Sequence, residues 1–427
     1  TGMNAHTANE QTVYKVDFPK NRLDAWAKVE AERFAQPVFR LFQTEIETVY
    51  EELIRGWDAP FDLVWKAFYR EMYKGHPYSV PIIGTPEHLK NPRLSKMYAF
   101  YDRYYVPNNM AVALAGDFEP AEALAVLERE FGRLKPKPLP EAGWPAVVTP
   151  TATVRADVNF EGEEVALFGW PTVPTGHPDA DALEVMGMVA SNGEAGLVDL
   201  RLNQAQAVKY AGTFQEFLTA SGFFNAYVAP KDGQTLEQAQ ALLVGTLDAI
   251  RKGEFDEADL KAIVLNFEIA EKYKREDNVA RVAAMINSFT EFDEWERRAG
   301  QLERLRKVTK ADVVRVAQKY LGEGRVEVYR RKGKPQIPNI AKPQFTKVDL
   351  GSGRQSEFAK EVAAMKAAPI EPRWVVKGAD YVAGKGPFGK VVAAKNPMND
   401  LFSISYQMEW GSRHDRTRSP MRSRPSQ

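Results

Sequence analysis

The sequence predicts an α+β fold made of repeated two-layer modules, each a mainly antiparallel sheet with helices packed on one face. Two observations indicate this class. Strand-like and helix-like patterns alternate through residues 1–120 and again through 151–333, and a proline-rich stretch lies between the two regions. At roughly 150 residues per domain, a chain of 427 residues is long enough for two or three domains.

The first module is predicted to run from a strand through several helices to a closing strand. Residues 12–16 are expected to form the first strand, 23–34 and 41–54 two helices, and 110–115 the closing strand. The second module is expected to end in the same way, with a helix that leads into a strand.

An internal repeat connects the two modules. A helical pattern ending at Tyr105 leads into a strand, as does another ending at Tyr320, and the prolines Pro19 and Pro230 recur at nearly the same offset. Two landmarks at one offset favour a duplicated fold over the alternative that any two strand-helix units look alike. We therefore predict that Tyr105 and Tyr320 occupy equivalent positions.

Proline and composition mark the remaining segments. Residues 121–150 are predicted to be a helix and a linker, because the five prolines there can neither continue a helix nor donate sheet hydrogen bonds. A connector is expected over 334–373 and the start of a second half over 374–415. The arginine, serine and proline of 416–427 predict a disordered tail, in which Met421 stays unburied.

Bulk composition excludes several classes of partner. Lysine plus arginine equal aspartate plus glutamate at 57 each, so no net field attracts nucleic acid or an anionic membrane. The absence of cysteine excludes disulfides and thiol catalysis. No apolar run approaches the roughly 20 residues that span a bilayer. Neither a nucleic-acid partner nor a membrane span is predicted.

The helix over 41–54 carries four glutamates. Its apolar stripe consists of Phe42, Ile46, Val49 and Leu53. At about 100° per residue, Glu45 and Glu52 lie together on the border of this stripe, two turns apart, whereas Glu47 and Glu51 are expected to face solvent. A carboxylate on that border is either a surface group with a buried stem or a positioned ligand, and the helix geometry leaves both open.

Four blocks occur along the chain in one order. They are Gly2-Met-Asn-Ala-His-Thr with Thr12-Val-Tyr, Glu45-x3-Val49-x2-Glu52, His76-Pro-Tyr-Ser-Val-Pro-Ile-Ile-Gly-Thr, and Tyr105-Val-Pro-Asn-Asn-Met up to Asp117. In this order and spacing they resemble the pitrilysin/insulinase (inverzincin) family of zinc metallopeptidases. The resemblance covers nearly the whole chain.

The resemblance implies a zinc-dependent endopeptidase that hydrolyses peptides or small unfolded proteins. In that family an H-x-x-E-H motif supplies two zinc-binding histidines and a general-base glutamate, and a distal glutamate completes the ligands. By resemblance Glu52 is the distal ligand. Glu45 maps to a neighbouring glutamate that orients Glu52 or a metal-bound water.

The H-x-x-E-H motif itself is absent from this sequence. The five histidines are His6, His76, His88, His177 and His414, and none belongs to such a motif. In the family the motif lies upstream of the strand around Asn4. The chain is therefore interpreted as a fragment truncated at both ends and inactive by itself, with Zn²⁺ bound by the intact protein. His6 and His76 are interpreted as surface or loop histidines.

Asn4 and Ala5 are predicted to bind substrate. By resemblance, their strand is a sheet edge along which an extended peptide lies, and unpaired edge groups can bind a backbone as an added strand. A turn asparagine is the alternative for Asn4.

Three functions remain compatible with the sequence: part of an active zinc endopeptidase, a non-catalytic homologue that acts as a scaffold or partner subunit, and a peptide-binding module unrelated to proteolysis. Glu45 and Glu52 at ligand spacing favour the first. The expected partners are peptide substrates and either the other half of the same chain or a homologous subunit. An exported or periplasmic location is favoured over a cytoplasmic one.

Overall fold

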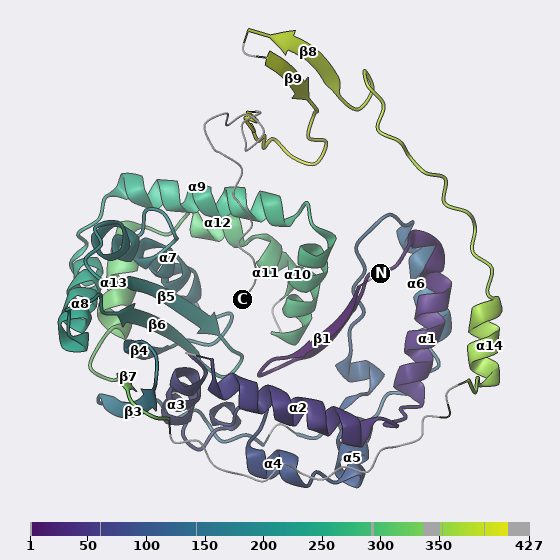
Figure 1. Ribbon diagram of the computed structural model, residues 1–427, viewed down its shortest axis with the longest axis horizontal. Helices are drawn as coiled ribbons and strands as arrows, with labels where there is room; N and C mark the ends of the chain where they lie inside the picture. The colour runs from purple at the N-terminus through teal and green to yellow at the C-terminus, as the bar shows by residue number, and fades with distance from the viewer. Residues whose placement is uncertain are drawn as a thin grey trace, which may run out of the picture. The chain divides into compact units, whose positions relative to one another are not determined.

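The computed structural model describes residues 2–59, 61–141, 143–291, 294–335, 351, 353–387 and 389–408 (Figure 1). The chain divides into two compact units, Thr1–Glu371 and Pro372–Gln427. Both predicted modules fall within the first unit.

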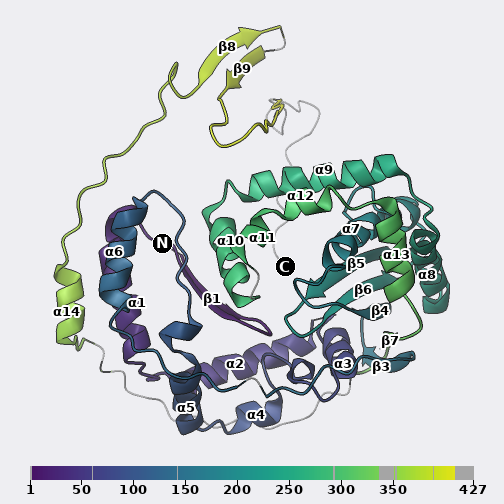
Figure 2. The same cartoon turned by 180° about the vertical axis from the view of Figure 1, so that it is seen from behind.

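The first region of this unit is a β-hairpin followed by helices. Its elements are β1 (Met3–Thr7), β2 (Thr12–Val16), η1 (Lys20–Arg22), α1 (Leu23–Ala35), α2 (Phe42–Trp57), α3 (Asp62–Met72), η2 (Pro77–Ser79), α4 (Pro86–Lys90), α5 (Leu94–Tyr104), η3 (Pro107–Asn109) and α6 (Pro120–Phe131). The helices α1 and α6 pack against each other (Figures 1 and 2). The predicted strand over 12–16 and the predicted helices over 23–34 and 41–54 are confirmed, with shifts at the helix ends.

The prediction of a strand over 110–115 is wrong. These residues belong to no strand, and in the described part of the first region the only ladder is the one between β1 and β2. A strand needs a neighbouring backbone to pair its N–H and C=O groups, and a local apolar pattern cannot supply one. The first region therefore presents a hairpin instead of a larger sheet.

The second region contains a five-stranded sheet. Its elements are β3 (Val154–Phe160), β4 (Val165–Thr172), α7 (Ala180–Ala190), the π-helix η4 (Asp199–Gln204), β5 (Tyr210–Phe217), β6 (Gly222–Ala229), α8 (Leu236–Lys252), α9 (Glu257–Lys274), α10 (Asn278–Thr290), α11 (Trp295–Ala299), α12 (Gln301–Leu305), α13 (Lys310–Tyr320) and β7 (Val326–Lys332). The strand order is β3-β7-β4-β6-β5, and every neighbouring pair except β3 with β7 is antiparallel.

The ends of α8 show how local sequence sets a helix boundary. Thr235 and Gln238 form a reciprocal capping box at the first turn. At the other end Gly253 takes the left-handed conformation, with φ of 74°, which an L side chain rarely adopts. The helix is thus delimited by side-chain hydrogen bonds at its start and by a glycine at its end.

Both faces of this sheet are covered. Alternate residues of β4 point to opposite sides: Phe168 and Trp170 join the core under α7, α8 and α13, whereas Leu167 joins a second core. The helix α3 of the first region supplies that second core, with Phe68 packed on Phe223 at 5.1 Å between ring centroids. The second region's own helices lie on one face, as predicted, and a helix from the neighbouring region covers the other.

The connector contains α14 (Glu357–Ala364), which packs on α1, where Lys28 pairs with Glu361 at 2.5 Å. The second unit contains an antiparallel hairpin of β8 (Val382–Gly386) and β9 (Gly389–Ala393). The predicted disordered tail over 416–427, including Met421, lies outside the described residues. Of the helices that the structure describes, none has the length and hydropathy needed to span a membrane.

Candidate functional site

The strand β1 presents an unpaired backbone edge. Its pairing with β2 is fixed at both ends, because the Asp17 N–H donates to the Gly2 carbonyl at 2.7 Å and the Ala8 N–H donates to the Gln11 carbonyl at 2.8 Å. In an antiparallel ladder, hydrogen-bonded and non-hydrogen-bonded pairs alternate. The even-numbered residues of β1 therefore bond to β2, and the odd-numbered ones direct their N–H and C=O groups to the free edge.

The free-edge residues are Met3, Ala5 and Thr7. All of β1 is exposed. In the described part of the chain no third strand pairs with it. The Ala5 N–H donates to the side-chain oxygen of Asn4 at 2.8 Å. The Asn4 side-chain oxygen thus occupies the place where an added strand would bring a carbonyl, and an added strand has to displace it. Both residues predicted to bind substrate lie on the exposed strand β1.

Hydrogen bonds hold the hairpin tip in position. The Glu10 carboxylate accepts the Thr219 N–H with both oxygens, at 3.0 and 3.1 Å, and also accepts the hydroxyls of Thr219 and Tyr78. Burial and the bond to Glu10 raise the pKa of Tyr78 to about 12, so its hydroxyl stays protonated and donates. The Thr290 hydroxyl donates to Gln11 at 2.9 Å. The second region therefore anchors the turn that carries β1.

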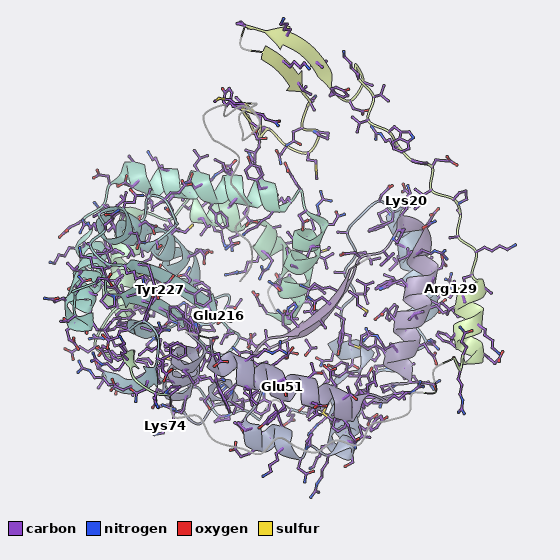
Figure 3. All side chains as sticks on the ribbon, in the orientation of Figure 1. Lys20, Glu51, Lys74, Arg129, Glu216 and Tyr227 are labelled. Atoms are coloured by element: carbon purple, nitrogen blue, oxygen red, sulfur yellow. The ribbon has the colours of Figure 1, made fainter. Side chains whose placement is uncertain are left out.

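The helix α2 places Glu45 and Glu52 in solvent. Both are exposed, whereas Glu47 and Glu51 are half-buried; Figure 3 labels Glu51 on this helix. The expectation that Glu45 and Glu52 lie at the border of the core is therefore wrong, and so is the expectation that Glu47 and Glu51 face solvent. The physical reason is that the buried face of α2 is centred on Tyr50 and Leu53. This face is rotated about the helix axis relative to the stripe predicted from the apolar residues alone.

The described residues do not by themselves fit a zinc ion. Zinc takes three or four nitrogen, oxygen or sulfur ligands from a protein. In the described ranges no group of three histidine, aspartate or glutamate side chains is placed to hold a metal. Glu52 can supply one carboxylate ligand, and Glu45 lies two turns before it on the same exposed side.

The two histidines nearest the hairpin have different surroundings. His6 lies on β1 and is exposed. His76 caps η2 in the predicted loop but is buried, at 5% exposure, and its Nδ1 accepts the Tyr78 N–H at 3.2 Å. Burial lowers the pKa of His76. The interpretation of His76 as a loop residue is correct, although the residue is not on the surface.

The sequence did not reveal a group of carboxylates beside the hairpin tip. A cavity of about 440 Å³ is lined by Glu10, Glu184 and Glu216 among others; Figure 3 labels Glu216 near the end of β5. Burial raises the pKa of Glu184 and of Glu216, although the Gln215 amide and the Tyr69 hydroxyl donate to them at 2.7 and 2.8 Å respectively. These residues come from distant parts of the chain, so no local spacing connects them.

Comparisons with known proteins agree with this fold. Residues 93–267 match the family model described as Peptidase M16 inactive domain. Over 279 residues the chain is 25% identical to a Helicobacter pylori protein named Zinc protease PqqE, covering 62% of this chain and 61% of that protein.

Two solved structures show the same fold. A protease from Helicobacter pylori superposes with a TM-score of 0.72 at 21% identity, covering 77% of this chain and 82% of that chain. The first half of the periplasmic protease PqqL from Escherichia coli superposes with a TM-score of 0.63 at 18% identity, covering 86% of this chain and 81% of that chain.

These matches define the fold class: α+β and rich in antiparallel strands, as in solved structures described as proteases or peptidases. The chain is similar to M16 peptidases over residues 93–267 and in its fold, which confirms the predicted resemblance to the pitrilysin/insulinase family. It spans between 30% and 61% of the length of the first curated relatives that it matches.

Proposed function

We propose that the chain is part of a zinc-dependent metalloendopeptidase that hydrolyses peptides or small unfolded proteins. In this proposal β1 binds the substrate as an added strand, and Glu52 supplies one ligand to a Zn²⁺ ion whose histidine ligands are not in this sequence. Glu45 then orients Glu52 or a water beside it. The observation that carries the proposal is the free edge of β1, with outward N–H and C=O groups at Met3, Ala5 and Thr7.

Strand addition explains why these groups suit peptide binding. A peptide backbone paired with β1 gains hydrogen bonds that do not depend on its side chains, so an extended or unfolded chain is recognised by conformation. Because Glu10 fixes the hairpin tip, β1 is held in place before the peptide arrives, and less ordering is needed on binding.

The test is a proline at the free edge. Ala5→Pro removes an outward N–H, together with its bond to the Asn4 side chain, and leaves the groups that pair with β2 in place, so that pairing should survive. We expect Ala5→Pro to weaken binding of a fluorescein-labelled extended peptide about tenfold, measured by fluorescence anisotropy, because one hydrogen bond is lost and the ring obstructs the neighbouring strand. The control Ala5→Val keeps the N–H and should bind within about twofold of the parent. Equal affinity of the proline and valine variants would contradict the proposal.

A non-catalytic homologue that serves as a scaffold or partner subunit is the second candidate. The description of the matched model as an inactive domain supports it. Peptide hydrolysis by a longer form of the protein that carries an H-x-x-E-H motif, abolished by a chelator, would favour the peptidase. Peptide binding without hydrolysis in that form would favour the scaffold. An exported location is also proposed, supported by the likeness to a protease described as periplasmic.

A further inference from the structure

A second cleft opens at the end of β1. It has a volume of about 880 Å³ and is lined by residues 7–10 of the hairpin, parts of the loop 76–82, residues of the linker 144–149, and the turn 219–221. Thr7, the last residue of β1, is one of the lining residues. Since Thr7 directs its backbone to the free edge, a strand added along β1 continues toward this cleft.

The cleft is almost without charge. Of the described residues that line it, Glu10 alone carries a full charge, and Glu10 already accepts hydrogen bonds from Thr219 and Tyr78. No lysine or arginine is among them, so nothing there matches a phosphate or a carboxylate. A neutral occupant is therefore favoured.

One side of the cleft is apolar and open to solvent. Val80, Ile82 and Trp144 line it and are 49%, 55% and 64% exposed, respectively. Neighbouring exposed apolar side chains of this size mark surfaces that bind apolar partners.

His76 adds a polar group that is poised for a ligand. Because its Nδ1 accepts the Tyr78 N–H, the proton of the neutral ring lies on Nε2, and Nε2 has no hydrogen-bond partner in the described part of the chain. Only 5% of the His76 surface is exposed, yet the residue lines the cleft. Nε2 is not among the buried side-chain atoms that lack a partner, so it retains contact with solvent, and a carbonyl oxygen in the cleft can take the place of that water.

We propose that this cleft binds apolar, uncharged residues of a peptide whose adjoining segment is paired with β1, and that the Nε2–H of His76 donates to a backbone carbonyl of that peptide. The inference rests on the proposed function, since it extends the same strand-addition site. It adds a preference for apolar residues at one end of the paired segment.

The experiment uses the whole chain and four fluorescein-labelled ten-residue peptides. One alternates threonine and serine throughout. Two others carry Val-Leu-Val at the amino or the carboxyl end, because an added strand can run in either direction, and the fourth carries Glu-Lys-Glu at both ends. We expect one of the two apolar-ended peptides to bind about tenfold more tightly than the threonine-serine peptide, and the charged peptide to gain nothing.

Substitution of an apolar side chain in the cleft should remove that gain and leave binding of the threonine-serine peptide unchanged. Ile82→Ser should return the apolar-ended peptide to within about threefold of the threonine-serine peptide. The matched control Leu124→Ser alters a side chain on α6 that is 56% exposed and does not line the cleft, and should keep the gain. His76→Asn keeps an acceptor for the Tyr78 N–H but is too short to donate from the position of Nε2, so it should weaken binding of the apolar-ended and the threonine-serine peptides alike.

The outcomes separate the two claims. If Ala5→Pro weakens binding of the threonine-serine peptide but neither apolar end improves binding, the proposed role of the cleft is contradicted and binding at the β1 edge is still supported. Binding of none of the four peptides would overturn both. If Ile82→Ser and Leu124→Ser lose the gain equally, the proposed binding of apolar residues in the cleft is also contradicted. If His76→Asn does not fold, the comparison of the two serine variants still decides, because both change exposed side chains.

Discussion

Two helices of eleven residues, α5 and α7, show how differently the two regions of the first unit are packed. Most residues of α7 are buried, and none of α5 is. The sequence of α7 is apolar nearly all round, as in a helix enclosed by other elements. By contrast, α5 leaves Leu94, Met97 and Phe100 exposed. The second region therefore supplies the large buried core, and the first region carries the proposed peptide-binding edge.

The largest expected effect on stability is in the second region. Phe168 on β4 is fully buried in its core. Phe168→Ala should lower the free energy of unfolding by about 3–5 kcal/mol, from lost burial and the cavity that remains. Phe100→Ala, on the exposed face of α5, should change it by less than about 0.5 kcal/mol. Urea unfolding followed by circular dichroism measures both, and similar losses in the two variants would contradict the contrast between the regions.

The next effect concerns a buried ion pair. Burial alone would raise the pKa of Asp179, but hydrogen bonds from Lys319, Tyr320 and Arg315, at 2.8, 2.6 and 2.7 Å, outweigh it and hold the pKa well below its usual range. Because the folded pKa is depressed, this stabilisation is complete above the unfolded pKa of about 4 and is lost as the pH falls below it.

Asp179→Asn should therefore lower the free energy of unfolding by about 1–3 kcal/mol at pH 7, with a smaller difference from the parent at pH 3. The corresponding change in the first region is Asp117→Asn, which breaks an exposed pair with Lys20 and should cost at most about 1 kcal/mol. If the difference in free energy of unfolding between Asp179→Asn and the parent stays constant from pH 7 to pH 3, the ionised Asp179 carboxylate is not the source of the stabilisation.

The last effect is on zinc affinity, at the proposed zinc ligand. In a longer form of the protein that carries an H-x-x-E-H motif, Glu52→Gln should weaken zinc binding by on the order of tenfold or more, since a neutral amide is a poor zinc ligand. Competition with a chromogenic chelator measures it. Glu51 is half-buried and so a poor control; the exposed Glu128 on α6 is better, and Glu128→Gln should leave zinc affinity unchanged. Equal effects from Glu52→Gln and Glu128→Gln would show that the wrong glutamate is assigned.

Local patterns predicted the elements that local forces determine. The predictions of a strand at 12–16 and of a helix ending at Tyr320 were correct, because apolar spacing and end residues such as Thr309 specify these elements. The prediction of a strand at 110–115 failed because a strand depends on a pairing partner elsewhere in the chain. Glu51 and Glu52 were placed on the wrong sides because apolar residues alone defined the stripe, whereas Tyr50 sets the buried face.

The candidate site was predictable only in part. The resemblance pointed to Asn4, Ala5 and Glu52, whose roles stay predictions. The anchoring of the hairpin by Glu10 joins residues far apart in sequence, at Thr219 and Tyr78, and no spacing reveals it. The predicted equivalence of Tyr105 and Tyr320 stays a prediction.

Amide hydrogen exchange along β1 tests the central claim most directly. On addition of an extended peptide, the N–H groups of Ala5 and Thr7 should exchange more slowly, because they point to the free edge and would pair with the added strand. The N–H groups of Asn4 and His6 already bond to β2 and should change little. Uniform protection of all four residues, or none at saturating peptide, would contradict binding of the peptide as a strand beside β1.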